Sequence, residues 1–275
     1  MVKLEKTMGN DEKLPLAKSG RGAFEVANQA VREAGSIIMA HFHGEKRVTY
    51  KEGRSNIVTD VDLLAEEKMM ALFRHEYPGF GIITEESKDI AGDSAYTWII
   101  DPIDGTRNYA YGIPHFCVAI ALAQGEEVVL GIAYDPVRDE LFRAEKGNGA
   151  FLNDSPIAVS TKKSLQAALV GFDMGYDADI GQKILGVASA LWPVVVSVRV
   201  MGSAALGLAY AACGRLDLYL HLALYPWDLA AGILLVGEAG GVITELDGKP
   251  VGIHSKSVIA TSSGIHEDFL RRVNR

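Results

Sequence analysis

Between residues 80 and 157 the chain is built from short apolar runs that polar turns separate. The runs GIIT, TWIID, FCVAIALA, EVVLGIAYD and ELFRAEKG are rich in β-branched and aromatic residues, and the turns include QGEE, DPVRDE and GNG. Runs of this length and composition are typical of strands, and short turns join antiparallel neighbours. This feature restricts the fold most, because it predicts an antiparallel meander over residues 80–157.

Two amphipathic helices are predicted before this meander. Apolar residues recur at helical spacing over residues 24–42, and a second helix is predicted over about residues 60–77, where Pro78 and Gly79 end it. A short strand is expected at residues 47–50. Helices that pack on an antiparallel sheet are typical of an α+β arrangement.

After residue 160 the pattern changes to alternating strands and helices. The expected strands are 168–172, 194–200, 217–220, 242–246 and 257–261, and the expected helices are 204–213, 228–238 and one from residue 266 onward. Such alternation is typical of α/β structure. We therefore divide the chain into a polar N-terminal tail (1–21), an α+β half (22–158) and an α/β half (159–275).

The composition excludes several classes of protein. The net charge of −8 argues against a broad nucleic-acid-binding surface. No segment approaches the roughly 20 apolar residues that a membrane span needs, and the N-terminus has no apolar signal core. Cys117 and Cys213 lie far apart without a CxxC motif, as expected for reduced thiols. We expect a cytoplasmic protein that binds neither nucleic acid nor membrane.

The segment WIIDPIDGTRNY, residues 98–109, places two aspartates at the end of a predicted strand. Pro102 cannot donate to a sheet, so we expect the chain to turn out there and to present Asp101 and Asp104. The N–H groups of Gly105 and Thr106 would then be free to bind an anion. A lone aspartate more often caps a helix or forms a turn, but two adjacent carboxylates repel each other unless a cation neutralises them.

Further acidic residues stand at similar positions. Glu85 and Glu86 follow the run GIIT, Asp228 follows Trp227, and Asp62 lies three residues after Thr59. Taken singly, these residues read as a solvated helix start, a helix cap and a capping box, respectively. Taken together, they form a set of oxygen ligands without a His or Cys cluster, which suits Mg²⁺.

These motifs resemble those of the inositol monophosphatase family of Mg²⁺-dependent, lithium-sensitive sugar phosphatases. Residues 101–106 match its D-P-[IL]-D-G-[TS] signature, and residues 227–232 and 238–241 match W-D-x-[AT]-[AG]-G and E-A-G-G. Residues 59–62 and 84–87 match two earlier elements, T-x-x-D and a [GT]-E-E-S. The resemblance covers about residues 22–270, and it implies a layered αβαβα sandwich that usually forms a homodimer.

The resemblance also implies roles for individual residues. The implied ligands of two to three Mg²⁺ ions are Glu85, Asp101, the Ile103 carbonyl, Asp104 and Asp228. The implied catalytic residues, which position and deprotonate the attacking water, are Thr106 and Asp62 together with Glu85. The implied substrate contacts are Asp104, Gly105, Thr106, Gly202, Ser203, Ala204, His221 and Asp228, and Lys51 lies on a mobile loop that closes the site.

The implied activity is hydrolysis of inositol monophosphate or related small sugar and polyol phosphates by metal-activated water. His221 replaces a Glu that contacts sugar hydroxyls in inositol-selective relatives, and Arg107 replaces a common Thr. Fructose 1,6-bisphosphate, histidinol phosphate and 3′-phosphoadenosine 5′-phosphate are alternative substrates, although the D-G-T-K-E motif of the 3′-nucleotidase branch is absent.

Two alternatives come from other classes of protein. An inactive regulatory relative would be expected to lose a metal carboxylate or Thr106, and this chain keeps all of them. A Mg²⁺-dependent nucleotide-binding protein would carry a glycine-rich phosphate loop, which the sequence lacks.

Overall fold

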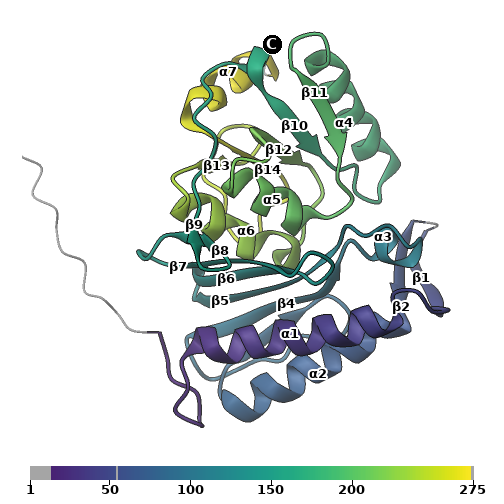
Figure 1. Cartoon of the computed structure of the whole chain (residues 1–275), viewed down its shortest axis with the longest axis vertical. Coiled ribbons are helices and arrows are strands. Elements are labelled where there is room, and N and C mark those ends of the chain that lie inside the picture. Colours follow the sequence, from purple (N-terminus) through teal and green to yellow (C-terminus); the bar gives the residue numbers. More distant parts are fainter. Residues whose placement is uncertain (1–13, 54, 274–275) are drawn as a thin grey trace, which may run out of the picture.

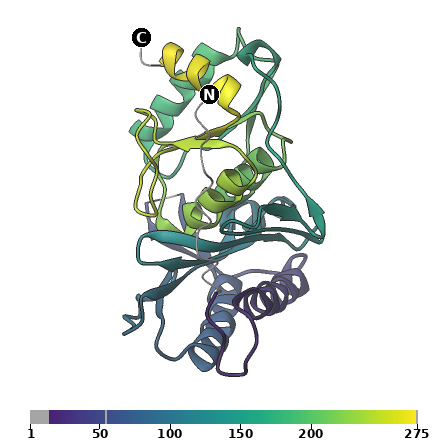
Figure 2. The same ribbon diagram turned by 90° about the vertical axis from the view of Figure 1, so that its left-hand side faces the viewer.

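The computed structural model describes residues 14–53 and 55–273, and its two larger sheets lie between three layers of helices (Figure 1). Helices α1 (Ala23–His41) and α2 (Asp60–Glu76) cover one face of a seven-stranded sheet. Helices α5 (Ala204–Ala212) and α6 (Pro226–Glu238) lie between the two sheets. The αβαβα sandwich that the family resemblance implied is therefore confirmed, and Figure 2 shows the same stack turned by 90°.

The outer layer of the second half covers a five-stranded sheet. Helices α4 (Ala178–Leu191) and α7 (Ser263–Val273) pack on this sheet through a separate apolar cluster that includes Ile184 and Phe269. The expected last helix begins at Ser263, three residues before the sequence indicated. Three apolar clusters, one for each helical layer, thus hold the sandwich together.

The seven-stranded sheet has the order β3-β4-β5-β6-β7-β8-β9. Its strands are β3 (Gly81–Thr84), β4 (Tyr96–Asp104), β5 (Cys117–Gln124), β6 (Glu127–Asp135), β7 (Glu140–Glu145), β8 (Ala150–Leu152) and β9 (Ser155–Pro156). The predicted antiparallel meander is confirmed from β4 to β9 but is wrong for β3, which pairs parallel with β4. After β3 the chain folds back, so that Ile90 bridges to Ile82, and β4 therefore starts at the same end as β3.

Strand β5 explains how the sheet packs differently on its two faces. Val118, Ile120 and Leu122 point toward α1 and α2. The alternate residues Cys117, Ala119, Ala121 and Ala123 are small and point toward α5 and α6. Side chains alternate between the two faces of a strand. The sheet therefore carries large residues on the face toward α1 and α2, and small residues on the other face, where α5 and α6 can approach closely.

Strand β4 continues through Pro102, so our expectation that the chain leaves the sheet there is wrong. Asp101 pairs with Ala119 and Asp104 pairs with Cys117, with a shift of register between the two pairs. Over this interval β4 advances three residues while β5 advances two. The extra residue forms a bulge, where Pro102 needs no ladder N–H, and the bulge bends Asp101 and Asp104 into the site.

The five-stranded sheet has the order β11-β10-β12-β14-β13. Its strands are β10 (Leu169–Phe172), β11 (Ser197–Val200), β12 (Leu218–His221), β13 (Val242–Thr244) and β14 (Val258–Thr261). Only β10 pairs in parallel, with β11 and β12, so the sheet is mixed. β11 is shorter than the expected 194–200, because the N–H groups of Val194 and Val195 donate to Leu191 O in the turn that ends α4.

The connection between the helices of the first half contains a hairpin that sequence analysis described only in part. β1 (Val48–Glu52) pairs antiparallel with β2 (Asn56–Thr59), which runs directly into α2. The predicted capping box is confirmed at this junction: Thr59 N–H donates to Asp62 Oδ2 at 2.9 Å, and Asp62 N–H lies 3.4 Å from Thr59 Oγ1.

A polar tail is expected over residues 1–21, and residues 1–13 of it lie outside the described residues. The rest of that segment folds against the end of α2: Lys18 N–H donates to Glu76 O at 2.8 Å, and Arg21 pairs with Glu76 at 2.8 Å.

The proposed division near residue 158 falls between β9 and β10, and it stays a prediction about domain organisation. Within the described residues, no helix combines the length and the apolar character needed to cross a membrane.

The close approach of α6 to the seven-stranded sheet generates a prediction about stability. A Cβ atom at Gly131 would lie 2.8 Å from Ala231 O, a backbone atom of α6. Gly131→Ala should therefore lower the free energy of unfolding by about 1–3 kcal/mol, as overpacking does. The measurement is urea unfolding followed by circular dichroism.

Gly186→Ala is the matched control for this change. Gly186 lies in α4, and a Cβ atom added there would have no neighbour within 4 Å. The substitution should therefore raise the free energy of unfolding by about 0.5–1 kcal/mol, because alanine favours the helix interior more than glycine does. Equal effects of the two substitutions would contradict the close β6–α6 contact.

Candidate active site

Three buried or half-buried aspartates meet where the two halves of the chain join. Each of Asp101, Asp104 and Asp228 offers a carboxylate oxygen within 4.8 Å of the others. Asp101 and Asp104 come from the bulge of β4, and Asp228 comes from the first turn of α6. Burial raises the pKa of Asp101 and of Asp228 well above the ordinary range, and the neighbouring carboxylates raise both further.

The Asp104 carboxylate is bound by the N-terminus of α5. Its Oδ1 accepts from Ala204 N–H at 3.0 Å, and its Oδ2 accepts from Ala205 N–H at 2.8 Å and from the Ser203 hydroxyl. Burial raises the pKa of Asp104, and these hydrogen bonds oppose that rise. The bonds hold β4 of the first half against α5 of the second half, which fits the favourable place of an anion at a helix N-terminus.

Asp101 differs from Asp104 because one of its oxygens is unsatisfied. Asp101 is 1% exposed, and its Oδ1 has no hydrogen-bond partner among the described residues. An unpaired buried oxygen of a carboxylate is unfavourable, and here two further carboxylates surround it. The residues therefore fit a bound divalent cation: three hard oxygen donors converge, and one of them has no other partner.

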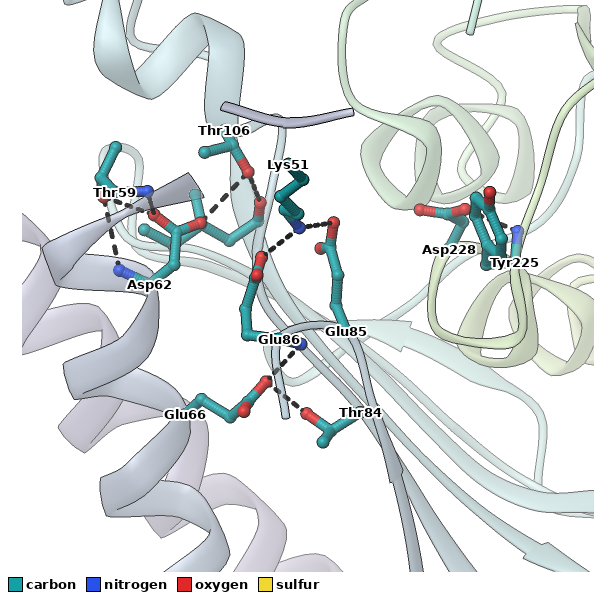
Figure 3. Close-up of polar contacts among 11 residues, drawn as sticks. Lys51, Thr59, Asp62, Glu66, Thr84, Glu85, Glu86, Thr106, Tyr225 and Asp228 are labelled. Carbon is teal, nitrogen blue, oxygen red and sulfur yellow. Dashed lines mark hydrogen bonds and ion pairs between the residues drawn. The ribbon is translucent and has the colours of Figure 1, made fainter. Parts of the chain in front are cut away.

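Glu85 lies beside this group and is paired with a cation of the protein itself. Lys51 Nζ, from β1, lies 2.8 Å from Glu85 Oε1 and 2.6 Å from Glu86 Oε1 (Figure 3). Burial lowers the pKa of Lys51, but the two carboxylates outweigh it and raise that pKa. Burial, followed by the charge of Glu85, raises the pKa of Glu86 to about 8. The structure thus brings Lys51 onto Glu85, at the edge of the three aspartates.

Thr106 and Asp62 form a hydroxyl–carboxylate pair. Thr106 Oγ1 lies 3.1 Å from Asp62 Oδ1 and 2.9 Å from the Ile103 carbonyl oxygen, so the hydroxyl can donate to either (Figure 3). The other oxygen of Asp62 accepts from Thr59 at the start of α2. Burial raises the pKa of Asp62 to about 6, and the hydrogen bonds from Thr59 oppose the rise. Such a pair can orient a water molecule and take up its proton.

Gly105 occupies a position that admits no side chain. Its φ is +98°, and a Cβ would lie 3.0 Å from Gly202 O and 3.2 Å from His115 O. Helix α3 (Thr106–Ala110) begins directly after it, so the N–H groups of its first turn have no intrahelical acceptor. Such N–H groups can bind an anion, and the role expected for those of Gly105 and Thr106 stays a prediction.

One pocket collects all the predicted substrate contacts. Its lining includes Asp104, Gly105, Thr106, Gly202, Ser203, Ala204, His221 and Asp228. Arg107 also lines this pocket, where its guanidinium lies 4.8 Å from the centre of the Tyr176 ring and Nη1 donates to Gly175 O at 3.4 Å. Arg107 therefore belongs to the pocket wall.

His221 lines the pocket, and a backbone N–H occupies one of its two ring nitrogens. Its Nδ1 accepts from Ala223 N–H at 3.0 Å, and burial, with the nearby charge of Arg107, lowers its pKa to about 4. The ring is therefore neutral at pH 7 and carries its proton on Nε2. The Glu that relatives carry at this position would instead offer acceptors.

Sequence reasoning missed three residues around the site. Asp173 follows β10, lines the pocket and accepts from Tyr219 OH at 2.7 Å. The strand-end rule that singled out Asp101 applies equally to Asp173. Asn108 Nδ2 donates to His115 O at 2.8 Å and to Met201 O at 3.1 Å, and no sequence pattern signals this role. The third residue, Glu66, lies four residues after Asp62 on the buried face of α2.

Comparison with known proteins supports the interpretation of this geometry. A sequence model described as "Inositol monophosphatase family" matches residues 22–275. The chain belongs to the inositol monophosphatase family. It is therefore a metal-dependent phosphatase, that is, a phosphoric monoester hydrolase.

Individual members of the inositol monophosphatase family align over most of the chain. Inositol monophosphatase 1 of Solanum lycopersicum is 38% identical, over 89% of this chain and 92% of the relative. A fructose-1,6-bisphosphatase/inositol-1-monophosphatase of Thermotoga maritima is 36% identical, over 89% and 93%. The crystal structure of the extragenic suppressor protein suhB of Bartonella henselae superposes with a TM-score of 0.87 at 37% identity, covering 92% of this chain and 98% of that one.

The contrast between Asp104 and Asp101 generates a prediction. In metal-free protein at pH 7, Asp104→Asn should lower the free energy of unfolding by about 1–3 kcal/mol, because an amide nitrogen then faces the N–H donors of α5. Asp101→Asn should leave that free energy unchanged or raise it, because it removes a repelled carboxylate. The measurement is urea unfolding in EDTA, and equal losses for both variants would contradict the assignment.

Proposed function

We propose that this enzyme hydrolyses inositol monophosphate or related small sugar and polyol phosphates, with Mg²⁺ as its metal. The observation that carries the proposal is the buried Oδ1 of Asp101, which lies within a group of three aspartates and has no hydrogen-bond partner in the described part of the chain. Asp101, Asp104 and Asp228 would hold the metal with Glu85 and the Ile103 carbonyl, in two to three sites. Bound Mg²⁺ would neutralise the charge of the phosphate and polarise its P–O bonds.

The chain's own residues supply the proton chemistry and the orientation. Thr106 Oγ1 would accept a hydrogen bond from the attacking water while it donates to Asp62, whose carboxylate takes up the proton. The raised pKa of Asp62, about 6, suits a base that works near neutral pH. The free N–H groups of Gly105 and Thr106 would hold phosphate oxygens in line with that water.

The pocket wall favours one of the alternative substrates over another. Arg107 and the Nε2–H of His221 both offer donors, whereas the Glu found in inositol-selective relatives would offer acceptors at position 221. A second phosphate, as in fructose 1,6-bisphosphate, would be an acceptor for both groups. A cationic alcohol, as in histidinol phosphate, would be repelled by Arg107. We therefore place bisphosphorylated sugars second and histidinol phosphate below them.

Three further properties rest on the sequence: the homodimer and the lithium inhibition on the family resemblance, and the cytoplasmic location on the composition. We propose that the enzyme is a homodimer, that it is cytoplasmic and that lithium inhibits it. Lithium would compete for the oxygen ligands that we assign to Mg²⁺.

The proposed function is tested by phosphate release from a panel of esters. The panel contains inositol 1-phosphate, fructose 1,6-bisphosphate, histidinol phosphate and 3′-phosphoadenosine 5′-phosphate, each with Mg²⁺ and with EDTA. We expect Mg²⁺-dependent turnover of the first two, and Thr106→Ala should lower kcat by about 10²–10⁴-fold with little change in KM. Undiminished turnover in EDTA would rule out the metal-dependent mechanism.

Selectivity is tested at His221. His221→Glu should lower KM for inositol 1-phosphate and raise KM for fructose 1,6-bisphosphate, because a carboxylate accepts from hydroxyls and repels a second phosphate. Each change should be about 10-fold or more. The measurement is steady-state kinetics on both esters at saturating Mg²⁺.

His221→Gln is the matched control for this experiment. Glutamine offers both a donor and an acceptor without a charge, so it should shift the two KM values less than glutamate does. If His221→Glu leaves both KM values unchanged, His221 does not contact the substrate.

A further inference from the structure

Glu66 is a buried acidic residue to which the proposed function assigns no role. It lies on α2, one turn after Asp62, and is only 1% exposed. Residues four apart on a helix share a face, so Asp62 and Glu66 both project toward the ends of β3 and β4. Glutamate is almost never so fully buried without partners, and its contacts therefore indicate what it does.

The contacts of Glu66 are with the turn that carries Glu85. Glu66 Oε2 accepts from the Thr84 hydroxyl at 2.5 Å and from Glu86 N–H at 2.9 Å (Figure 3). Thr84 and Glu86 are the two chain neighbours of Glu85, so one carboxylate oxygen binds the side-chain hydroxyl of the residue before it and the backbone N–H of the residue after it. Hydrogen bonds to an ionised group are about twice as strong as those between neutral groups.

The contacts place Glu85 relative to the other predicted ligands. Thr84 is the last residue of β3 and pairs with Ile100, the residue before Asp101 on β4. The direction of the chain after Thr84 then decides where the Glu85 side chain points. Among the described residues, the side-chain hydrogen bonds of Glu85 are made to Lys51, on the separate β1–β2 hairpin. The two hydrogen bonds from Glu66 therefore connect this turn to α2, the helix that also carries Asp62.

The burial of Glu66 is unfavourable for the fold, and this argues that its hydrogen bonds to the turn have a function. Its second oxygen, Oε1, is buried and has no hydrogen-bond partner among the described residues. Such an atom destabilises a fold, because its desolvation is not compensated by a hydrogen bond. A residue kept only for packing would not need a buried carboxylate that is hydrogen-bonded to this turn.

We infer that Glu66 is a positioning residue that sets the affinity of the enzyme for the cation at Glu85. It holds the Thr84–Glu86 turn so that the Glu85 carboxylate stays beside Asp101 and Asp104. The inference rests on the proposed function, because that function assigns Glu85 to the metal. Residues that orient metal ligands typically change metal affinity by about 10–100-fold when they are removed.

The test measures Mg²⁺ binding directly, without relying on turnover. Isothermal titration calorimetry gives the Mg²⁺ dissociation constant of the wild type and of Glu66→Ala, Glu66→Gln and Thr84→Val. Glu66→Gln keeps an oxygen acceptor, and Thr84→Val removes one of the two contacts while leaving the Glu66 carboxylate in place. Glu67→Ala is the control, because Glu67 is the next residue on α2 and is exposed.

We expect Glu66→Ala to weaken Mg²⁺ binding by about 10–100-fold, and Glu66→Gln and Thr84→Val to weaken it less. Phosphate release should show the same increase in the Mg²⁺ concentration for half-maximal rate. At saturating Mg²⁺, KM for inositol 1-phosphate should match the wild type. Glu67→Ala should match the wild type in every measurement.

Two results would overturn the inference. The first is a folded Glu66→Ala variant, shown by its circular dichroism spectrum, with wild-type Mg²⁺ affinity. The second applies if Glu66→Ala does not fold, and it is wild-type Mg²⁺ affinity in both Glu66→Gln and Thr84→Val. If the wild type hydrolyses phosphate esters with Mg²⁺ and the variants bind Mg²⁺ normally, only this inference fails. If the wild type neither binds Mg²⁺ nor hydrolyses the esters, the proposed function fails as well.

Discussion

The hydrogen bonds of the Asp104 carboxylate are the interactions on which the rest of the site depends. The carboxylate stands on the bulge of β4 and accepts hydrogen bonds from Ser203, Ala204 and Ala205, about 100 residues further along the chain. These bonds bring the N-terminus of α5 over the end of β4. The predicted substrate pocket lies where this contact joins the first half of the chain to the second.

The same arrangement creates an electrostatic conflict that the fold does not resolve by itself. Asp101, Asp104 and Asp228 converge in a buried space, and burial together with mutual repulsion raises the pKa of each. Hydrogen bonds satisfy Asp104, whereas Oδ1 of Asp101 has no partner among the described residues. Carboxylates that repel one another in a buried space favour the binding of a cation, because the cation neutralises the repulsion between them. Stability is thus given up locally for metal binding.

Local rules predicted much of the fold correctly and failed at identifiable places. Helical spacing located α1 and α2, and the capping box at Thr59 and Asp62 formed as predicted, because these features depend on near neighbours in sequence. The rule that proline ends a strand failed at Pro102, because a bulge lets β4 continue to Asp104. The parallel pairing of β3 was also missed, because it depends on how the loop around Ile90 folds back along Ile82.

The sequence by itself determined the order of most of the elements, the family and the acidic residues that end strands or begin helices. Periodicity, turn residues and short motifs are local, so they can be recognised before the chain is folded. Only the tertiary structure decided which atoms those residues face. It showed that the Nδ1 of His221 accepts from Ala223 N–H at the pocket wall, and that Glu66 binds the turn around Glu85. Partners such as Glu66 and Thr84 meet only after the helix packs against the sheet. A pattern within one segment of the sequence therefore cannot predict a contact between two separate segments.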